Sequence, residues 1–248
     1  INPKNERIAV KAKSVFDTSK RYFYVSPYMH KMAFTEKFEA NNLITTIPAA
    51  PALLANNLRA SLIKNRIPIS GKVINRVTDP NPEERQFLAK YSSPTMVDII
   101  YFTNQKSDNA LAESLLKTVG FYKTGNVSLE SGRETIVRHL EEKRYDFDGL
   151  VLADGSGLSR ANKVKPISQV KFLADVMKEK YYDDFLKSLP IAGETGTLRR
   201  MFKSGNNYGQ IFAKTGTLNG VKCLAGYIKT RDGRILSFSL LINGYLGS

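Results

Sequence analysis

The spacing of apolar residues along the chain predicts helices through its middle and strands towards its end. Leucine, isoleucine and valine recur at helical spacing in several stretches. These helices are expected at 52–64, 93–106, 110–120, 131–142, 166–176 and 181–189. Short apolar or alternating runs that are bounded by turn residues predict strands. These strands are expected at 7–12, 21–25, 72–77, 87–91, 150–152, 210–214, 221–229 and 235–243.

The strand at 210–214 ends in a stretch that is rich in polar chemistry. It runs into Lys-Thr-Gly-Thr at 214–217, and an Asn-Gly pair at 219–220 then predicts a hairpin turn to the next strand. We expect the first strand at the edge of an antiparallel sheet, where an extended peptide could pair along it. The lysine and the threonine hydroxyls would suit a carboxylate. The alternative interpretation is a polar strand end that enters a turn.

A second polar motif interrupts two predicted helices. Ser-Asp-Asn at 107–109 lies on a short loop between helices whose apolar faces are expected to be buried. A loop that packed helices hold in place is suited to catalytic positioning. Serine β-lactamases and penicillin-binding proteins use Ser-x-x-Lys, Ser-Asp-Asn and Lys-Thr-Gly together, and the last two occur here in the required order.

Four longer stretches make this resemblance specific. Residues 106–116 resemble the K-S-D-N-x-x-A-E-x-L-L stretch of the D-alanyl-D-alanine carboxypeptidase/endopeptidase family, the class C penicillin-binding proteins of peptidase family S13. Residues 154–160 resemble that family's D-G-S-G-L-S-R, and 189–198 resemble its L-P-x-A-G-x-D-G-T-L, with Glu-Thr in place of the usual pair. Residues 238–245 resemble its last core strand. The matches run from about residue 92 to the end of the chain.

The resemblance implies an α+β fold of the penicillin-binding/β-lactamase-like transpeptidase type, an antiparallel sheet flanked by helices. Residues 81–248 would be the C-terminal part of the catalytic domain, and residues 1–80 a remnant of the β-rich accessory domain that the family inserts. The breaker-rich stretch 78–82 suits a boundary. The implied enzyme is a serine-type DD-peptidase that hydrolyses peptidoglycan peptides through an acyl-enzyme, is acylated by β-lactams, works in the periplasm or otherwise outside the cytoplasm, and needs no cofactor.

The resemblance also assigns roles to residues of the two short motifs. A serine hydroxyl in the interhelical loop would relay protons to the leaving amine, and an asparagine amide would hold a substrate amide. The lysine would attract the substrate carboxylate and favour the oxyanion. The expected catalytic residues are Ser107, Asn109 and Lys214, and the expected substrate-binding residues are Thr215, Gly216 and Thr217.

The glycine-rich loop at 154–160 carries polar residues with a less specific signal. Ser156 and Ser159 are expected to cap or brace the loop. Arg160 either faces a substrate carboxylate or is structural.

The nucleophile is the main departure from the family pattern. The family places Ser-x-x-Lys before the accessory insertion, and that segment is missing here, so we expect this chain to lack its own nucleophile. One Ser-x-x-Lys occurs, with Ser61 and Lys64 on one helical face, but without the usual Pro-Ala leader. Two alternatives therefore stay open: a catalytically silent peptidoglycan-binding module, and a serine β-lactamase-like hydrolase that uses Ser61.

The amino-acid composition limits the classes of binding partner that we expect. The 248 residues carry a net charge of +14, from 37 Lys+Arg and 23 Asp+Glu. Such a surface favours polyanions, either nucleic acid or an anionic cell-wall polymer. Nucleic acid is not expected, because no zinc-finger spacing or RNA-binding signature occurs. No apolar run approaches the length of a transmembrane segment, and no ligand spacing indicates a metal. The single cysteine, Cys223, is expected to be a buried apolar residue.

Overall fold

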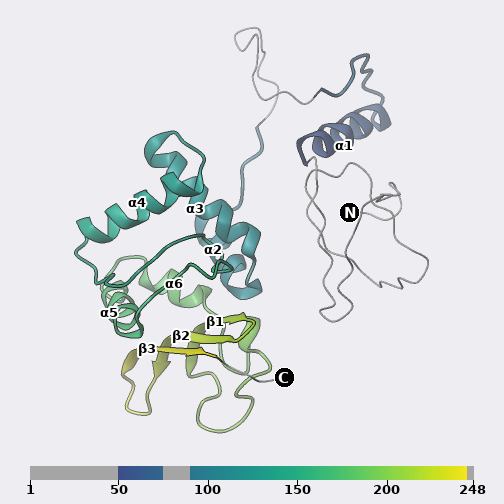
Figure 1. The fold of residues 1–248 in the computed structure, drawn as a ribbon. Coiled ribbons are helices and arrows are strands. Elements are labelled where there is room, and N and C mark those ends of the chain that lie inside the picture. Colours follow the sequence, from purple (N-terminus) through teal and green to yellow (C-terminus); the bar gives the residue numbers. More distant parts are fainter. Residues whose placement is uncertain (1–49, 75–89, 245–248) are drawn as a thin grey trace. The chain divides into compact units, whose positions relative to one another are not determined.

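The computed structural model describes residues 50–74 and 90–244 (Figure 1). The chain divides into two units, residues 1–89 and residues 90–248. In the first unit, α1 (Ala50–Lys64) is the helix that the leucine spacing predicts. The strand predicted at 72–77 is wrong for residues 72–74, which form no strand, and its remainder lies outside the described residues. The strands predicted at 7–12 and 21–25 also lie outside them.

The second unit has helices first and a sheet last, and the predicted α+β class is confirmed. In Figure 1, α3 and α4 lie farthest from the strands, and α5 and α6 lie nearer to them. Packing pairs α3 with α4, α2 with α6, and α5 with β3. The elements are α2 (Met96–Lys106), α3 (Asn109–Thr124), α4 (Leu129–Glu142), α5 (Pro166–Val176), α6 (Tyr182–Ser188), the 3₁₀ turn η2 (Gly196–Leu198), β1 (Ile211–Leu218), β2 (Val221–Lys229) and β3 (Ile235–Asn243).

The sheet is an antiparallel meander in the order β1-β2-β3. The first hairpin pairs Leu218 with Val221 across the predicted Asn-Gly turn, so that prediction is confirmed. In this order β1 is an edge strand of the described sheet, also as predicted. It runs on to Leu218, four residues beyond the predicted end, because the whole Lys-Thr-Gly-Thr stretch pairs with β2.

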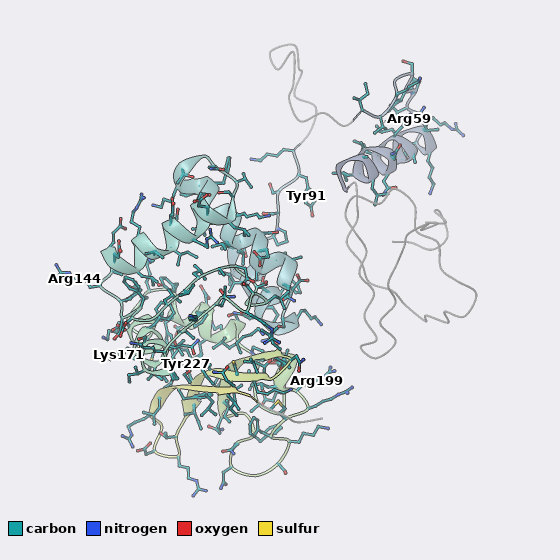
Figure 2. The ribbon with its side chains drawn as sticks, viewed as in Figure 1. Arg59, Tyr91, Arg144, Lys171, Arg199 and Tyr227 are labelled. Carbon is teal, nitrogen blue, oxygen red and sulfur yellow. The ribbon has the colours of Figure 1, made fainter. Side chains whose placement is uncertain are left out.

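Both faces of the sheet are covered near the start of β1. On one face Tyr227, which Figure 2 labels, is fully buried. It packs with Leu173 and Leu189 from the α5–α6 region, and its hydroxyl donates to the Leu173 carbonyl at 2.9 Å. On the other face Ala213 packs with Leu198 and other residues of the segment that precedes β1. Packing on both faces of the sheet therefore holds β1 in place, and β1 contains the Lys-Thr-Gly-Thr motif.

Three predictions for the second unit are wrong in detail. The helix predicted to close at Gly120 continues to Thr124 as α3, because Gly120 lies where α4 packs: a Cβ there would sit 2.4 Å from Ser131 Oγ. The buried strand predicted at 150–152 is a single bridge between Val151 and Lys163, and Val151 is 44% exposed. The strand predicted at 87–91 is absent at residues 90–91, and 87–89 lie outside the described residues.

None of the helices within residues 50–74 and 90–244 has the length and hydrophobicity needed to cross a bilayer.

Candidate active site

The bend between α2 and α3 has two residues in specialised conformations. Ser107 ends α2 in the left-handed region, with φ 55°, which turns the chain sharply out of the helix. Asp108 then caps α3, since its side chain accepts a hydrogen bond from the Leu111 N–H at 2.9 Å. Asn109 is therefore the first residue of α3. The Ser-Asp-Asn motif thus fixes the direction of the Ser107 and Asn109 side chains.

The end of α2 is anchored from the other side by a buried glutamine. Gln105 is only 7% exposed, and its Nε2 donates to the carbonyls of Ser188 at 3.0 Å and Leu189 at 2.9 Å. The neighbouring Asn104 donates to Ser188 Oγ at 2.8 Å. These bonds tie the last turn of α2 to the end of α6, two residues before Ser107.

Lys214 joins the bend to the sheet. Its Nζ donates to Ser107 Oγ at 2.7 Å and to the carbonyl of Thr215 at 2.7 Å. The side chain is half-buried, and the burial lowers the pKa of the lysine from its ordinary value of 10.5. The Ser107 hydroxyl accepts from the ammonium, which leaves its own O–H free to donate elsewhere.

The outer edge of β1 changes character at Lys214. Before it, the edge is covered, because Ala213 N–H donates to the Pro190 carbonyl and Ala192 N–H donates to the Ile211 carbonyl. Residues 211 and 213 therefore point their backbone groups outwards, and by alternation so do Thr215 and Thr217. Among the described residues, the bridges along this edge end at Ala213. A peptide could pair with the rest of the strand.

The predicted site residues line one cavity of about 940 Å³. The motif residues in its wall are Ser107, Asn109, Lys214, Thr215, Gly216 and Thr217. The glycine-rich loop at 154–160 also lines it, as do Cys223 on β2 and Leu241 on β3. The structure thus brings the two motifs together across a single cleft, although they lie more than a hundred residues apart in the sequence.

Gly216 forms part of the cleft wall. It pairs across the strands with Cys223, and a Cβ at Gly216 would lie 3.3 Å from the Cys223 Cβ. Cys223 is half-buried beside the cleft, so it is less enclosed than the sequence predicts. Thr215 Oγ1 donates to Thr197 Oγ1 at 2.9 Å, so a hydroxyl from η2 belongs to the same polar cluster.

The loop at 154–160 has its own internal hydrogen bonds. Asp154 accepts from the N–H groups of Gly157 at 2.7 Å and Ser159 at 2.6 Å, and from Asn162 Nδ2 at 2.8 Å. Burial alone would raise the pKa of Asp154, but these donors outweigh it and hold the pKa below the ordinary value. Asn162 Oδ1 in turn accepts from the Ala153 N–H at 2.7 Å. The loop therefore behaves as one compact piece.

The predicted bracing roles in this loop fit the contacts. Ser156 Oγ donates to Glu113 at 2.7 Å, and Ser159 Oγ accepts from the Ala161 N–H at 3.2 Å. Arg160 donates from Nη2 to the carbonyl of Asn219 in the β1–β2 turn at 2.9 Å. That contact gives Arg160 a structural partner, which is one of the two interpretations that the sequence left open.

Three residues of this site were missed in the sequence: Glu113, Asn162 and Thr197. A signal existed for Glu113, because it lies in the predicted helix that follows the Ser-Asp-Asn motif, about one helical turn after Asn109. No local pattern identifies Asn162 or Thr197.

Ser61 lies exposed on α1, in the first unit, and Lys64 ends the same helix. The use of Ser61 as a nucleophile stays a prediction. Among the described residues, no three His, Cys, Asp or Glu side chains gather closely enough to hold a metal ion.

Comparison with known proteins shows which family carries these motifs. The model of the D-Ala-D-Ala carboxypeptidase 3 (S13) family matches residues 22–248. The D-alanyl-D-alanine carboxypeptidase DacB of Haemophilus influenzae is 31% identical over 221 residues, which are 88% of this chain and 46% of that protein. A D-alanyl-D-alanine carboxypeptidase of Actinomadura sp. is 32% identical over 203 residues, or 79% of this chain and 38% of that protein.

Solved structures agree with the sequence matches. The crystal structure of penicillin binding protein 4 (dacB) from Haemophilus influenzae, complexed with a novel β-lactam, has a TM-score of 0.74 at 31% identity. The match covers 82% of this chain and 47% of that chain. The chain therefore spans about half the length of these relatives, or less.

Proposed function

Because the chain belongs to the D-Ala-D-Ala carboxypeptidase 3 (S13) family, we propose that the full-length protein is a serine-type D-alanyl-D-alanine carboxypeptidase/endopeptidase. It cleaves peptidoglycan peptides through an acyl-enzyme and is acylated by β-lactams. The observation that carries the proposal is the 2.7 Å hydrogen bond from Lys214 Nζ to Ser107 Oγ at one wall of the cleft. Support also comes from the relatives that are named D-alanyl-D-alanine carboxypeptidases.

Ser107 carries the proton transfer in this proposal. Its oxygen accepts from Lys214, so its own proton is directed away from the lysine and towards a bound group. When the leaving amine departs, this O–H is the donor within reach. Asn109 begins the next helix on the same cleft wall, where its amide can both donate to and accept from a substrate amide. The catalytic residues proposed are thus Ser107, Asn109 and Lys214.

Thr215, Gly216 and Thr217 bind the substrate in this proposal. The ammonium of Lys214 attracts a C-terminal carboxylate, and the Thr217 hydroxyl donates to it. The Thr215 hydroxyl donates to it as well once it gives up its hydrogen bond to Thr197. The outward backbone groups of these threonines pair with an extended peptide, and the Thr217 N–H faces the developing oxyanion. Gly216 keeps this part of the wall free of a side chain.

The same proposal assigns the two parts of the chain. Residues 81–248 form the C-terminal part of the catalytic domain, and residues 1–80 form a remnant of the accessory domain. The support is that both short motifs and the glycine-rich loop fall in the second unit.

The protein works outside the cytoplasm in this account, because peptidoglycan is assembled there. The net charge of +14 supports contact with an anionic cell-wall polymer, an association that weakens as salt concentration rises. The proposed chemistry is carried by side chains and needs no cofactor.

The test uses the full-length protein with a fluorescent penicillin and with a pentapeptide that ends in D-Ala-D-Ala. Covalent labelling together with release of D-Ala is the expected result. Reversible binding of muropeptides without any labelling would contradict the proposal and favour a catalytically silent module. A matched Ser61→Ala variant is expected to label like its parent, whereas loss of labelling in that variant would favour the β-lactamase-like hydrolase.

A further inference from the structure

Glu113 connects the two walls of the cleft, and the chemistry proposed above does not use it. It lies on α3, one helical turn after Asn109. Its Oε2 accepts from the Gly155 N–H at 3.2 Å, and its Oε1 accepts from the Ser156 N–H at 3.0 Å and from Ser156 Oγ at 2.7 Å. One carboxylate on the helix that begins at Asn109 therefore receives three hydrogen bonds from the glycine-rich loop.

The loop backbone lies directly on α3 at the same place. A Cβ on Gly155 would sit 2.6 Å from the Ala112 carbonyl oxygen and 3.0 Å from the Leu116 Cβ. Glycine is thus required for this approach, and Glu113 supplies the hydrogen bonds that hold it. Since the hydrogen bonds to Asp154 already make the loop one compact piece, its distance from Asn109 is set largely by the contacts of Glu113 and Gly155.

The far end of the loop reaches the opposite side of the cleft. Arg160 donates to the Asn219 carbonyl in the turn between β1 and β2. The loop thus spans from α3 to the hairpin that carries Lys214. Its residues in the cavity wall are Asp154, Gly155, Ser156, Gly157, Leu158, Ser159 and Arg160.

We propose that Glu113 is a positioning residue, which fixes the loop at 154–160 as a cleft wall at the separation from Asn109 and Lys214 that a bound substrate requires. This inference rests on the proposed function. The hydrogen bond between Lys214 and Ser107 does not involve Glu113. Loss of Glu113 therefore weakens capture of the substrate and leaves the acylation step itself nearly intact.

The test separates capture from chemistry in the full-length protein. Acylation by a chromogenic cephalosporin is followed in rapid mixing, which gives the dissociation constant of the first complex and the limiting acylation rate. Glu113→Ala is expected to raise the dissociation constant about 10-fold, because the binding-competent position of the loop would then be occupied only about a tenth of the time. The limiting rate is expected to stay within about 3-fold of the parent, since interactions made equally before and during reaction affect binding alone.

Two milder variants grade the effect. Glu113→Gln keeps one carbonyl oxygen for Ser156 and loses the acceptor for the Gly155 N–H, so its dissociation constant should lie between those of the parent and Glu113→Ala. Ser156→Ala removes only the hydroxyl donor and should have the smallest effect. If Glu113→Ala fails to fold, the dissociation constants of Glu113→Gln and Ser156→Ala test the inference in its place. Hydrogen exchange at the amides of Gly155 and Ser156 is expected to quicken in the same order as the dissociation constants rise.

The matched control is Glu134→Ala, the same substitution at an exposed position of α4, which should behave as the parent. The inference is overturned if the Glu113 variants bind the cephalosporin as the parent does, or if the limiting rate falls while binding is unchanged. A parent protein that is not acylated contradicts the proposed function instead. The role of Glu113 then stands or falls on amide exchange and on the reversible affinity for the same cephalosporin.

Discussion

Lys214 Nζ on β1 donates a 2.7 Å hydrogen bond to Ser107 Oγ, which lies 107 residues earlier in the chain. The contact requires the left-handed turn at Ser107 and an edge strand whose lysine points into the cleft. It couples a half-buried cation to a hydroxyl that is free to donate its own proton.

The first prediction concerns pH. Burial lowers the pKa of Lys214 below 10.5, and the proposed chemistry needs the ammonium form. The acylation rate should therefore fall as pH rises through the lowered pKa, before a free lysine would titrate. The contribution of Lys214 to stability changes with pH in the opposite direction. Between the lowered pKa and 10.5 this lysine binds more protons in the unfolded state than in the folded state, so its contribution to the free energy of unfolding increases as pH rises.

Acylation rates and denaturant titrations across that window check both signs. A Lys214→Gln variant serves as the control and should lose the part of each pH dependence that Lys214 contributes. An alkaline limb of the acylation rate at or above 10.5 would contradict the assignment.

Gln105 should matter to both stability and activity. Gln105→Leu removes the donor to two carbonyls at the end of α6 from a position that is 7% exposed. The expected loss is about 2 kcal/mol in the free energy of unfolding, measured in urea. Because Gln105 lies two residues before Ser107, the acylation rate of the folded protein should fall as well. The exposed neighbour Lys106, changed to Ala, is the control, and equal effects of the two changes would refute the prediction.

Gly226 is expected to tolerate no side chain. A Cβ there would lie 2.1 Å from the Phe212 carbonyl oxygen and 2.7 Å from the Ala213 Cα, both of them backbone atoms. Gly226→Ala should lower the free energy of unfolding by about 3 kcal/mol, as overpacking does. At Gly71 a Cβ would meet no described atom within 4 Å, so Gly71→Ala should stay within about 0.5 kcal/mol of the parent. A fully stable Gly226→Ala protein would show that β1 and β2 pair differently.

Tyr227 tests the core beneath the site. Its side chain is fully buried, and its hydroxyl donates to the Leu173 carbonyl. Tyr227→Phe should cost about 1 kcal/mol of unfolding free energy, the usual value of one hydrogen bond. Tyr227→Ala should cost about 4 kcal/mol through the cavity that it leaves. Both should keep the acylation rate of the folded fraction, because Tyr227 does not line the cleft. A Phe variant as stable as the parent would argue against the hydrogen bond.

Local signals explain what the sequence predicted correctly. The Asn-Gly pair at 219–220 specifies a hairpin by its own conformational preference, and leucine spacing specifies α1 whatever surrounds it. The two short motifs identified the cleft residues because each combines unusual side chains within three or four positions. These features depend on neighbours in the chain.

The missed features depend on contacts between distant segments. A glycine after an apolar stripe is typical of a helix end, so the sequence predicts that Gly120 closes a helix. In the structure Gly120 instead lies where α3 packs closely on α4, a contact between separate helices that the local sequence does not indicate. Glu113 contacts a loop more than forty residues away, so its role follows from tertiary packing. The apolar triplet at 150–152 is typical of a strand in its residue types, but in the structure it pairs through the single bridge between Val151 and Lys163. Whether such a triplet finds a partner strand depends on the rest of the fold.

A double-mutant cycle on acylation of the full-length protein by penicillin tests the central contact most directly. Ser107→Ala and Lys214→Ala should each slow acylation about 100-fold, and the double variant should be little slower than either, because residues that act as a unit are not additive. If the two losses multiply, or if neither substitution slows acylation, the hydrogen bond between Lys214 and Ser107 has no part in the reaction.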